Sequence, residues 1–200
     1  MRIAVIGGGP GGLFFAVLMK RANRSHEITV FERNAPDATF GFGVVFPERT
    51  LRYLREADQE THEAFIGASV TWDAIEYRHR GRVLQCGGHA FSGIARTDLL
   101  RILQQQAHWL GVNLRFAHEV SDLSAVVGCD LIVVADGINS LVRTGIAEEF
   151  QPSVNVGRSK YIWLGTTKVF DALTFIFEQS EHGWFGVHIY PYGATHSTFI

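Results

Sequence analysis

The chain begins Met1-Arg-Ile-Ala-Val-Ile-Gly-Gly-Gly-Pro-Gly-Gly-Leu13, and the order of residue types in this stretch decides the fold. Residues 2–6 are apolar and rich in β-branched side chains, which predicts a buried parallel strand. The glycines then predict a tight turn into a helix over residues 11–24. Residues 28–31 form a second apolar run that ends at Glu32. A strand, turn, helix and strand within about thirty residues predict a βαβ unit, whose strands are parallel.

Two further helices are predicted downstream. Pro47 can begin one that continues through Leu51 and Leu54, because proline is well tolerated in the first turn of a helix. From Arg96 onward apolar residues recur at helical spacing, which predicts an amphipathic helix. Gly111 stands directly after this pattern, in the position where glycine usually ends a helix.

Strand patterns occupy most of the remaining chain. Residues 70–83 partly alternate, and Arg80-Gly81 could turn them back on themselves, which predicts an antiparallel hairpin. Residues 112–116 and 131–135 have the pattern of strands, and the second run ends at Asp136-Gly137. Beyond Pro152 four more runs predict a second sheet: residues 161–170, 174–177, 184–190 and 197–200. The sequence therefore predicts an α/β fold, with a parallel sheet followed by a second, mostly antiparallel one.

The composition is that of a globular protein, with 46% hydrophobic and 19% charged residues in a chain of 200. Eighteen basic and twenty acidic residues leave a formal net charge of −2 and form no basic stripe, which disfavours a nucleic-acid partner. No apolar run approaches the ~20 residues that span a bilayer. The first run breaks at the glycines, so we expect neither a membrane span nor a cleaved leader.

Cysteine and histidine usage argues against structural metal or disulfides. Cys86 and Cys129 are too few for a disulfide framework or a zinc site, and they suit the reducing cytoplasm. We expect both to be buried as small hydrophobic residues. The nine histidines show no zinc-like spacing beside Cys, Asp or Glu, so no metal site is expected. The sequence favours a cytoplasmic protein.

Residues 7–12 match the pattern G-x-G-x-x-G. The first glycine permits a sharp turn, the next lets a pyrophosphate approach the backbone, and the third allows close packing of helix and strand. The helix N-terminus then presents free amides and a partial positive charge to the phosphates. Glycines also form ordinary turns, but the flanking strand and helix favour a dinucleotide site here.

Glu32 stands twenty positions after Gly12, at the end of the second strand. A carboxylate there can accept hydrogen bonds from the ribose hydroxyls and would repel a 2′-phosphate. A solvated strand-end carboxylate is the alternative interpretation. The two features together predict an unphosphorylated dinucleotide, and FAD and NAD meet that condition equally well.

Two later segments favour a flavin. Asp136-Gly137 follows an apolar strand, with Ser140 and Arg143 close behind, which places a carboxylate at the ligand edge of a parallel sheet. Arg96 begins the amphipathic helix, where its guanidinium can reach the flavin or the pyrophosphate. Taken alone, Asp136-Gly137 could be a plain turn and Arg96 a surface charge. The occurrence of both segments in this order makes these two alternatives less plausible.

With these motifs the chain resembles the FAD-dependent aromatic hydroxylases, the single-component flavoprotein monooxygenases. Their three fingerprints are the glycine motif, a D-G motif and a later G-D motif, and the first two stand here at residues 7–12 and at Asp136-Gly137 with Arg143. Three segments are more specifically similar to the salicyloyl-CoA 5-hydroxylase and anthraniloyl-CoA monooxygenase group, and to the tryptophan-derivative hydroxylases of violacein biosynthesis. They are Thr39-Phe-Gly-Phe-Gly-Val-Val-Phe46, Gly93-Ile-Ala-Arg96 and Tyr161-Ile-Trp-Leu-Gly-Thr-Thr-Lys168.

The resemblance implies a Rossmann-like FAD-binding domain over residues 1–152, with an inserted hairpin at about 68–88, and the start of an incomplete substrate-binding sheet domain over 153–200. It implies a flavin reduced by NADH or NADPH, a C4a-hydroperoxide formed with O2, and oxygen transfer to an activated aromatic ring. The expected partner is a small aromatic substrate, including a CoA thioester, and neither nucleic acid nor membrane.

The resemblance also implies which residues hold the cofactor. Few side chains need to act as acid or base because the chemistry belongs to the flavin, and the sequence assigns no catalytic residue. By family position residues 41–45 lie along the isoalloxazine, where glycines allow close approach. The expected FAD contacts are Gly7, Gly9, Pro10, Gly11, Gly12, Leu13, Glu32, Arg33, Gly43, Val44, Arg96, Asp136 and Gly137.

The sequence departs from the family pattern at its end. The G-D motif is missing because the chain stops at Ile200, and we expect a truncated piece of a longer enzyme. Two alternatives stay open: an NAD-dependent dehydrogenase that uses the same βαβ unit, and a non-catalytic FAD-binding module.

Overall fold

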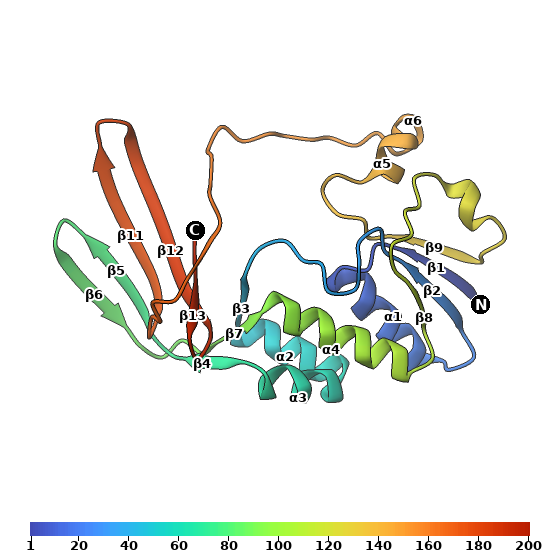
Figure 1. The fold of residues 1–200 in the computed structure, drawn as a ribbon, viewed down its shortest axis with the longest axis horizontal. Coiled ribbons are helices and arrows are strands. Elements are labelled where there is room, and N and C mark those ends of the chain that lie inside the picture. Colours follow the sequence, from blue (N-terminus) through green and yellow to red (C-terminus); the bar gives the residue numbers. More distant parts are fainter. The chain divides into compact units, whose positions relative to one another are not determined.

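The computed structural model describes all 200 residues, and its contacts divide the chain into two compact units (Figure 1). Unit 1 comprises Met1–Ala38 and Leu100–Arg158, and unit 2 comprises Thr39–Leu99 and Ser159–Ile200. Each unit is therefore assembled from two separate segments of the chain. None of the helices combines the length and apolar character that crossing a membrane requires.

Unit 1 is built on a four-stranded parallel sheet. Its strands are β1 (Arg2–Ile6), β2 (Glu27–Phe31), β8 (Asn113–Arg115) and β9 (Leu131–Val134), in the order β8-β2-β1-β9. All three neighbouring pairs are parallel, which confirms the predicted βαβ unit. β1 is central, and its residues from Ile3 to Ile6 are buried because strands and helices surround it.

Helices α1 (Pro10–Ala22) and α4 (Arg96–Trp109) lie on the same side of this sheet (Figure 1). The Arg21 guanidinium of α1 donates to the Gln106 side chain of α4 at 3.3 Å. α4 ends where the sequence predicts, with Gly111 in the left-handed region at φ 80°. The unit also contains the 3-10 helix η1 (Leu123–Val126) and the short helices α5 (Leu141–Gly145) and α6 (Ala147–Phe150).

Unit 2 contains a three-stranded antiparallel sheet, in the order β3 (Gly43–Pro47), β7 (Phe91–Ala95) and β4 (Val70–Trp72). Helices α2 (Glu48–Ala57) and α3 (Gln59–Gly67) connect β3 to β4. The rings of Phe46 and Phe65 meet edge to face at 4.8 Å, which fixes α3 against β3. Pro47 ends β3 in an extended conformation, so α2 begins one residue later than the sequence predicts.

The second sheet of unit 2 has six strands, in the order β10 (Leu164–Thr166), β13 (His196–Phe199), β12 (Gly183–Gly193), β11 (Leu173–Ser180), β5 (Ile75–His79) and β6 (Arg82–Cys86). Only β11 and β5 pair in parallel. The predicted hairpin is present, and Arg80 and Gly81 turn it with positive φ angles of 49° and 73°. The hairpin shares a sheet with strands from residues 164–199. The boundary between the two functional domains, at residues 152 and 153, stays a prediction.

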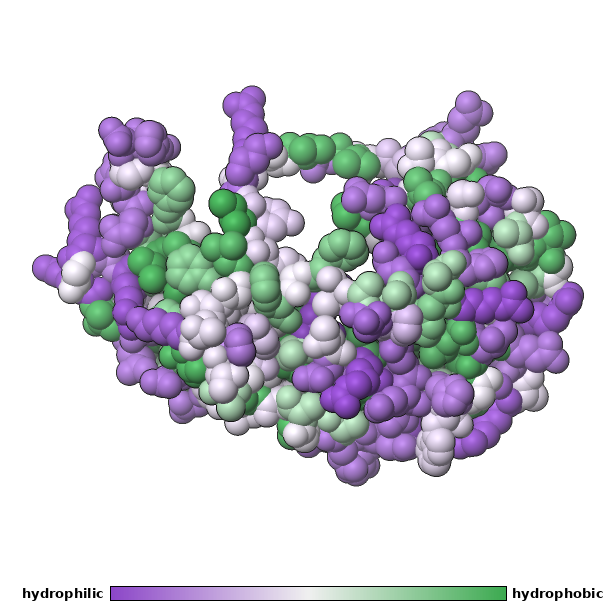
Figure 2. All heavy atoms as spheres, in the orientation of Figure 1, coloured by the Kyte–Doolittle hydropathy of each residue, from purple (hydrophilic) through white to green (hydrophobic).

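The expectation that both cysteines are buried is wrong for Cys86. β6 is an edge strand and all five of its residues are exposed, including this thiol, while Cys129 is partly buried. Alternation alone predicts which residues share a face, but not whether another strand covers them. Figure 2 shows hydrophobic residues at the surface of unit 2. The exposed hydrophobic side chains of its six-stranded sheet include Leu84, Phe177 and Phe185.

The two sheets of unit 2 approach closely where β7 crosses β12. A Cβ atom added at Gly93 would lie 2.1 Å from the backbone oxygen of Pro191 and 3.0 Å from the ring of Trp72. A backbone carbonyl cannot rotate away as a flexible side chain can. Only glycine therefore allows this crossing.

We expect Gly93→Ala to lower the free energy of unfolding by about 1–3 kcal/mol, because the new methyl group forces β7 and β12 apart. Urea denaturation followed by circular dichroism measures the change. Gly186→Ala is the matched control, since an added Cβ there would meet only the Phe177 ring at an ordinary 3.7 Å. Equal stability of the two variants would contradict the crossing constraint.

Burial raises the pKa of Tyr190 above its ordinary value of 10.0, and it also raises the pKa of Tyr192. Because the folded state disfavours tyrosinate, the contribution of Tyr190 to stability is complete below pH 10.0 and is lost as pH rises through the folded pKa. We expect Tyr190→Phe to make the unfolding free energy fall less steeply with pH above this value. Urea titrations at a series of alkaline pH values measure the slope, and identical slopes for the two proteins would contradict the assignment.

Candidate functional site

The glycine-rich turn after β1 packs against the end of β9. Gly7 has a φ of 109°, and a Cβ atom added there would lie 2.3 Å from the backbone oxygen of Ala135. A Cβ atom at Gly12 would lie 2.1 Å from the backbone oxygen of Gly7. Both positions exclude every other residue, because the opposing atoms belong to the backbone. These contacts bring the start of α1 close to β9.

The neighbouring glycines face open space instead. A Cβ atom added at Gly9 or Gly11 would meet nothing within 4 Å. Gly9 is the N-cap residue of α1, no side chain caps this end, and no acidic residue stands in the first turn. The first-turn amides and the positive end of the helix dipole therefore remain available to an anion from outside the helix.

The Glu32 carboxylate is fixed beside this turn by three hydrogen bonds. The Gly8 amide donates to Oε2 at 2.8 Å, and the amide and side chain of Asn34 donate to Oε1 at 2.8 and 2.7 Å. A carboxylate has about four acceptor positions, so capacity remains for hydroxyl donors. Glu32 is thus oriented by the backbone of the turn itself.

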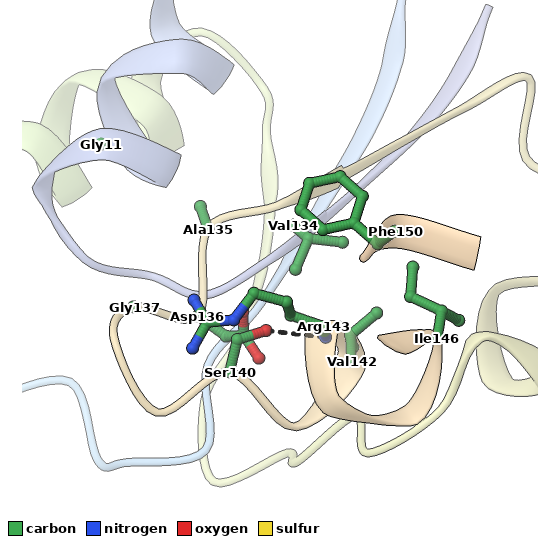
Figure 3. A pocket seen from close by; sticks show the side chains of 10 residues that line it. All are labelled: Gly11, Val134, Ala135, Asp136, Gly137, Ser140, Val142, Arg143, Ile146 and Phe150. Carbon is green, nitrogen blue, oxygen red and sulfur yellow. Dashed lines mark hydrogen bonds between the residues drawn. The ribbon is translucent and has the colours of Figure 1, made fainter. Parts of the chain in front are cut away.

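The end of β9 carries the second group of predicted residues. Gly137 has a φ of 87°, and the Asp136 Oδ2 atom accepts a hydrogen bond from the Leu141 amide at 3.0 Å. Ser140 caps α5 by accepting from the Arg143 amide at 2.9 Å. The Arg143 guanidinium donates to the backbone oxygen of Ile138. This loop is therefore held by its own short-range bonds, of which Figure 3 draws the one between Ser140 and Arg143.

A pocket of about 500 Å³ joins the turn to this loop. Figure 3 shows Gly11 at the start of α1 on one side and the residues that follow β9 on the other. Asp136, Ser140 and Arg143 supply the polar groups of the pocket lining. Its apolar side chains are those of Val134, Val142, Ile146 and Phe150. The structure thus brings Gly11 and Asp136 to one pocket although they are far apart in the sequence.

Two other predicted contact residues face elsewhere. The Leu13 side chain is fully buried in the core, and its amide donates to the Gly9 carbonyl at 3.0 Å. Arg33 is exposed and lies 3.8 Å from the Glu119 carboxylate. Pro10 begins α1, where its missing N–H costs the helix no hydrogen bond. The assignment of these residues to the cofactor stays a prediction.

Gly43, Val44 and Arg96 belong to unit 2, where they form one local structure. Gly43 pairs with Ala95 across the β3–β7 ladder, and the Arg96 amide donates to the Phe42 carbonyl at 2.8 Å. Gly41, at φ 88°, fits under the ring of Trp163, which a Cβ atom would approach to 2.6 Å. The Arg96 Nε and Trp163 Nε1 atoms are buried without a hydrogen-bond partner. This segment therefore carries buried donors that no protein group satisfies.

Two side chains that sequence reasoning did not assign to the site hold this segment. The Tyr190 hydroxyl donates to the Gly43 carbonyl at 3.0 Å, and the Gly43 amide donates to Thr198 Oγ1 at 2.9 Å. No local signal could reveal them, because they lie about 150 positions away, on β12 and β13. No group of three or more His, Cys, Asp or Glu side chains is placed to hold a metal ion.

Several curated proteins are similar to the chain over its whole length. Salicyloyl-CoA 5-hydroxylase of a Streptomyces species is 46% identical over 200 residues, which are 100% of this chain and 39% of the relative. The 3-hydroxy-4-methyl-anthranilyl-[aryl-carrier protein] 5-monooxygenase of Streptosporangium sibiricum is 33% identical, covering 100% and 56%. Protodeoxyviolaceinate monooxygenase of Chromobacterium violaceum is 32% identical, covering 100% and 54%. The chain thus spans about half of these relatives' length, or less.

The fold is also that of a solved structure. The crystal structure of a mutant of 2-methyl-3-hydroxypyridine-5-carboxylic acid oxygenase superposes with a TM-score of 0.76 at 18% identity, over 99% of this chain and 57% of the other. Residues 1–185 match the family model described as an FAD binding domain. The predicted resemblance is therefore confirmed, and this chain belongs to the FAD binding domain family.

Proposed function

We propose that this protein is an FAD-dependent monooxygenase that hydroxylates an activated aromatic ring, with NADH or NADPH as electron donor and O2 as oxidant. The observation that carries the proposal is the 46% identity, over all 200 residues, to a protein named as a salicyloyl-CoA hydroxylase. Two further relatives are named as monooxygenases. Bound FAD supplies the electron transfer and the activation of O2.

The residues of unit 1 fit the adenosine diphosphate half of FAD. The uncapped N-terminus of α1 and the open space at Gly9 and Gly11 suit a diphosphate. The remaining acceptor positions of Glu32 suit the ribose hydroxyls, and Asp136 and Gly137 stand at the edge of the same pocket. In this assignment the protein binds and orients the nucleotide.

We assign residues 41–45 of unit 2 to the isoalloxazine ring, with Arg96 beside them. The buried donors Arg96 Nε and Trp163 Nε1, which have no protein partner, support the assignment because carbonyl acceptors of a ligand would satisfy them. Gly41 and Gly43 leave backbone without side chains, which allows a flat ring to approach.

We propose an aromatic acyl thioester as the substrate and a cytoplasmic location. The named substrate of the Streptomyces relative supports the thioester. The exposed free thiol of Cys86 supports a reducing compartment, because such a thiol is prone to oxidation elsewhere.

The activity is tested by purifying the full-length protein and measuring NADH and NADPH oxidation with salicyloyl-CoA, free salicylate or CoA alone. We expect a yellow protein that contains FAD, and stimulation by the thioester together with a hydroxylated product. A colourless protein that ignores added FAD, or oxidation that no aromatic compound stimulates, would contradict the proposal.

We expect Gly9→Leu to abolish FAD retention without unfolding the protein, because its Cβ enters the open space assigned to the diphosphate. The visible flavin spectrum after gel filtration measures retention, and circular dichroism measures folding. Gly67→Leu is the control, since Gly67 also faces open space but lies on α3. Unchanged flavin occupancy in Gly9→Leu would contradict the assigned contact between Gly9 and the diphosphate.

We expect Glu32→Gln to weaken FAD binding about tenfold, because hydrogen bonds to a charged acceptor are roughly twice as strong as neutral ones. Quenching of flavin fluorescence on titration with the apoprotein measures the dissociation constant. Glu119→Gln removes a neighbouring exposed carboxylate and is expected to bind FAD like the original protein. Equal affinities in both variants would place the ribose elsewhere.

A further inference from the structure

The backbone of Gly43 is held by side chains on both its polar groups. Its amide donates to Thr198 Oγ1 at 2.9 Å, and its carbonyl accepts from the Tyr190 hydroxyl at 3.0 Å. Thr198 is 0% exposed and Tyr190 is 5% exposed, so water does not compete for these bonds. Losing either partner would leave a buried polar group unsatisfied.

The two hydroxyl groups reach Gly43 from neighbouring strands, since Tyr190 of β12 and Thr198 of β13 are register partners. A hydroxyl group can donate or accept, and here each takes one of these roles. Gly43 donates to Thr198, and Tyr190 donates to Gly43. Both polar groups of the Gly43 backbone are therefore satisfied by buried side chains of one sheet.

The surroundings leave Gly43 no alternative position. A Cβ atom added there would lie 2.4 Å from the Cβ atom of Tyr192, so β12 lies directly against it. The Phe42 carbonyl is bonded to the Arg96 amide, and Gly41 lies under the Trp163 ring. The two hydrogen bonds thus hold a segment that is already packed from β12 and from residue 163, and they set the remaining orientation of the Gly43 backbone.

We propose that Tyr190 and Thr198 are positioning residues that orient the Gly43 peptide, and through it residues 41–45, toward the flavin ring. This inference rests on the proposed function, because the flavin assignment of residues 41–45 belongs to it. The two side chains act through the backbone and touch no reacting atom. Their effect is therefore on the geometry of bound FAD rather than on a proton transfer.

The variants Thr198→Val and Tyr190→Phe each remove one hydroxyl that bonds to Gly43 while keeping nearly the same shape. Thr198→Ser keeps the hydroxyl and is the rescue variant. Tyr192→Phe is the matched control, because its ring packs on Gly43 but the two side-chain bonds to Gly43 come from Thr198 and Tyr190. Tyr190→Phe removes a single oxygen atom, so it decides the question if Thr198→Val does not fold.

The first readout needs no flavin. Hydrogen–deuterium exchange of the segment around Gly43 in the apoprotein reports whether its amide is bonded. We expect about tenfold faster exchange in Thr198→Val and a smaller acceleration in Tyr190→Phe. Thr198→Ser and Tyr192→Phe are expected to remain within about twofold of the original protein.

The second readout is the visible circular dichroism of bound FAD and its dissociation constant, measured where far-ultraviolet spectra show all variants folded. We expect a changed flavin spectrum and about tenfold weaker binding in Thr198→Val and Tyr190→Phe, restored in Thr198→Ser. A merely structural role would lower the unfolding midpoint and leave the spectrum of bound flavin unchanged.

The outcomes separate this inference from the proposed function. Unchanged exchange at Gly43, or faster exchange with an unchanged flavin spectrum, overturns the positioning role while FAD binding by the original protein stands. If the original protein itself binds no FAD, the proposed function fails, and the positioning role fails with it.

Discussion

The close approach of backbone to backbone at Gly7 and Gly12 is the constraint on which unit 1 depends. An added Cβ at either position would lie little more than 2 Å from a carbonyl oxygen, so strand, turn and helix can meet only through glycine. That contact sets the start of α1 against the end of β9 and opens the pocket that Gly11 and Asp136 share. The same packing leaves the first-turn amides uncapped beside a carboxylate that the turn itself orients.

Glycine also allows close contacts between strands in unit 2. Gly93 lets β7 cross β12, and Gly43 lets β3 lie against Tyr192. Here the approach places a backbone amide and carbonyl beside two buried hydroxyl groups, which satisfy both. Because a buried, unpaired backbone group is costly, the hydroxyls and the glycine specify one another. The backbone conformation at Gly43 is therefore held by strands that follow it by about 150 residues.

The polar groups of the candidate site are of the kinds that bind and orient a ligand. They are uncapped backbone amides at the start of α1, the Glu32 carboxylate held by the turn, and the buried Arg96 and Trp163 nitrogens without partners. Each is fixed in place by the surrounding backbone or packing. The chain belongs to the FAD binding domain family, and these groups are placed where such a ligand needs partners.

Local patterns in the sequence determined the elements whose reasons are local: the βαβ unit, the glycine turn with Glu32, the helix that ends before Gly111, and the hairpin at Arg80-Gly81. They did not determine that the hairpin joins the second sheet, that Cys86 is exposed, or that Tyr190 and Thr198 hold Gly43. Those features depend on which strands become neighbours. Propensity and periodicity report the conformation of a segment, whereas pairing between distant segments is decided only when the whole chain packs.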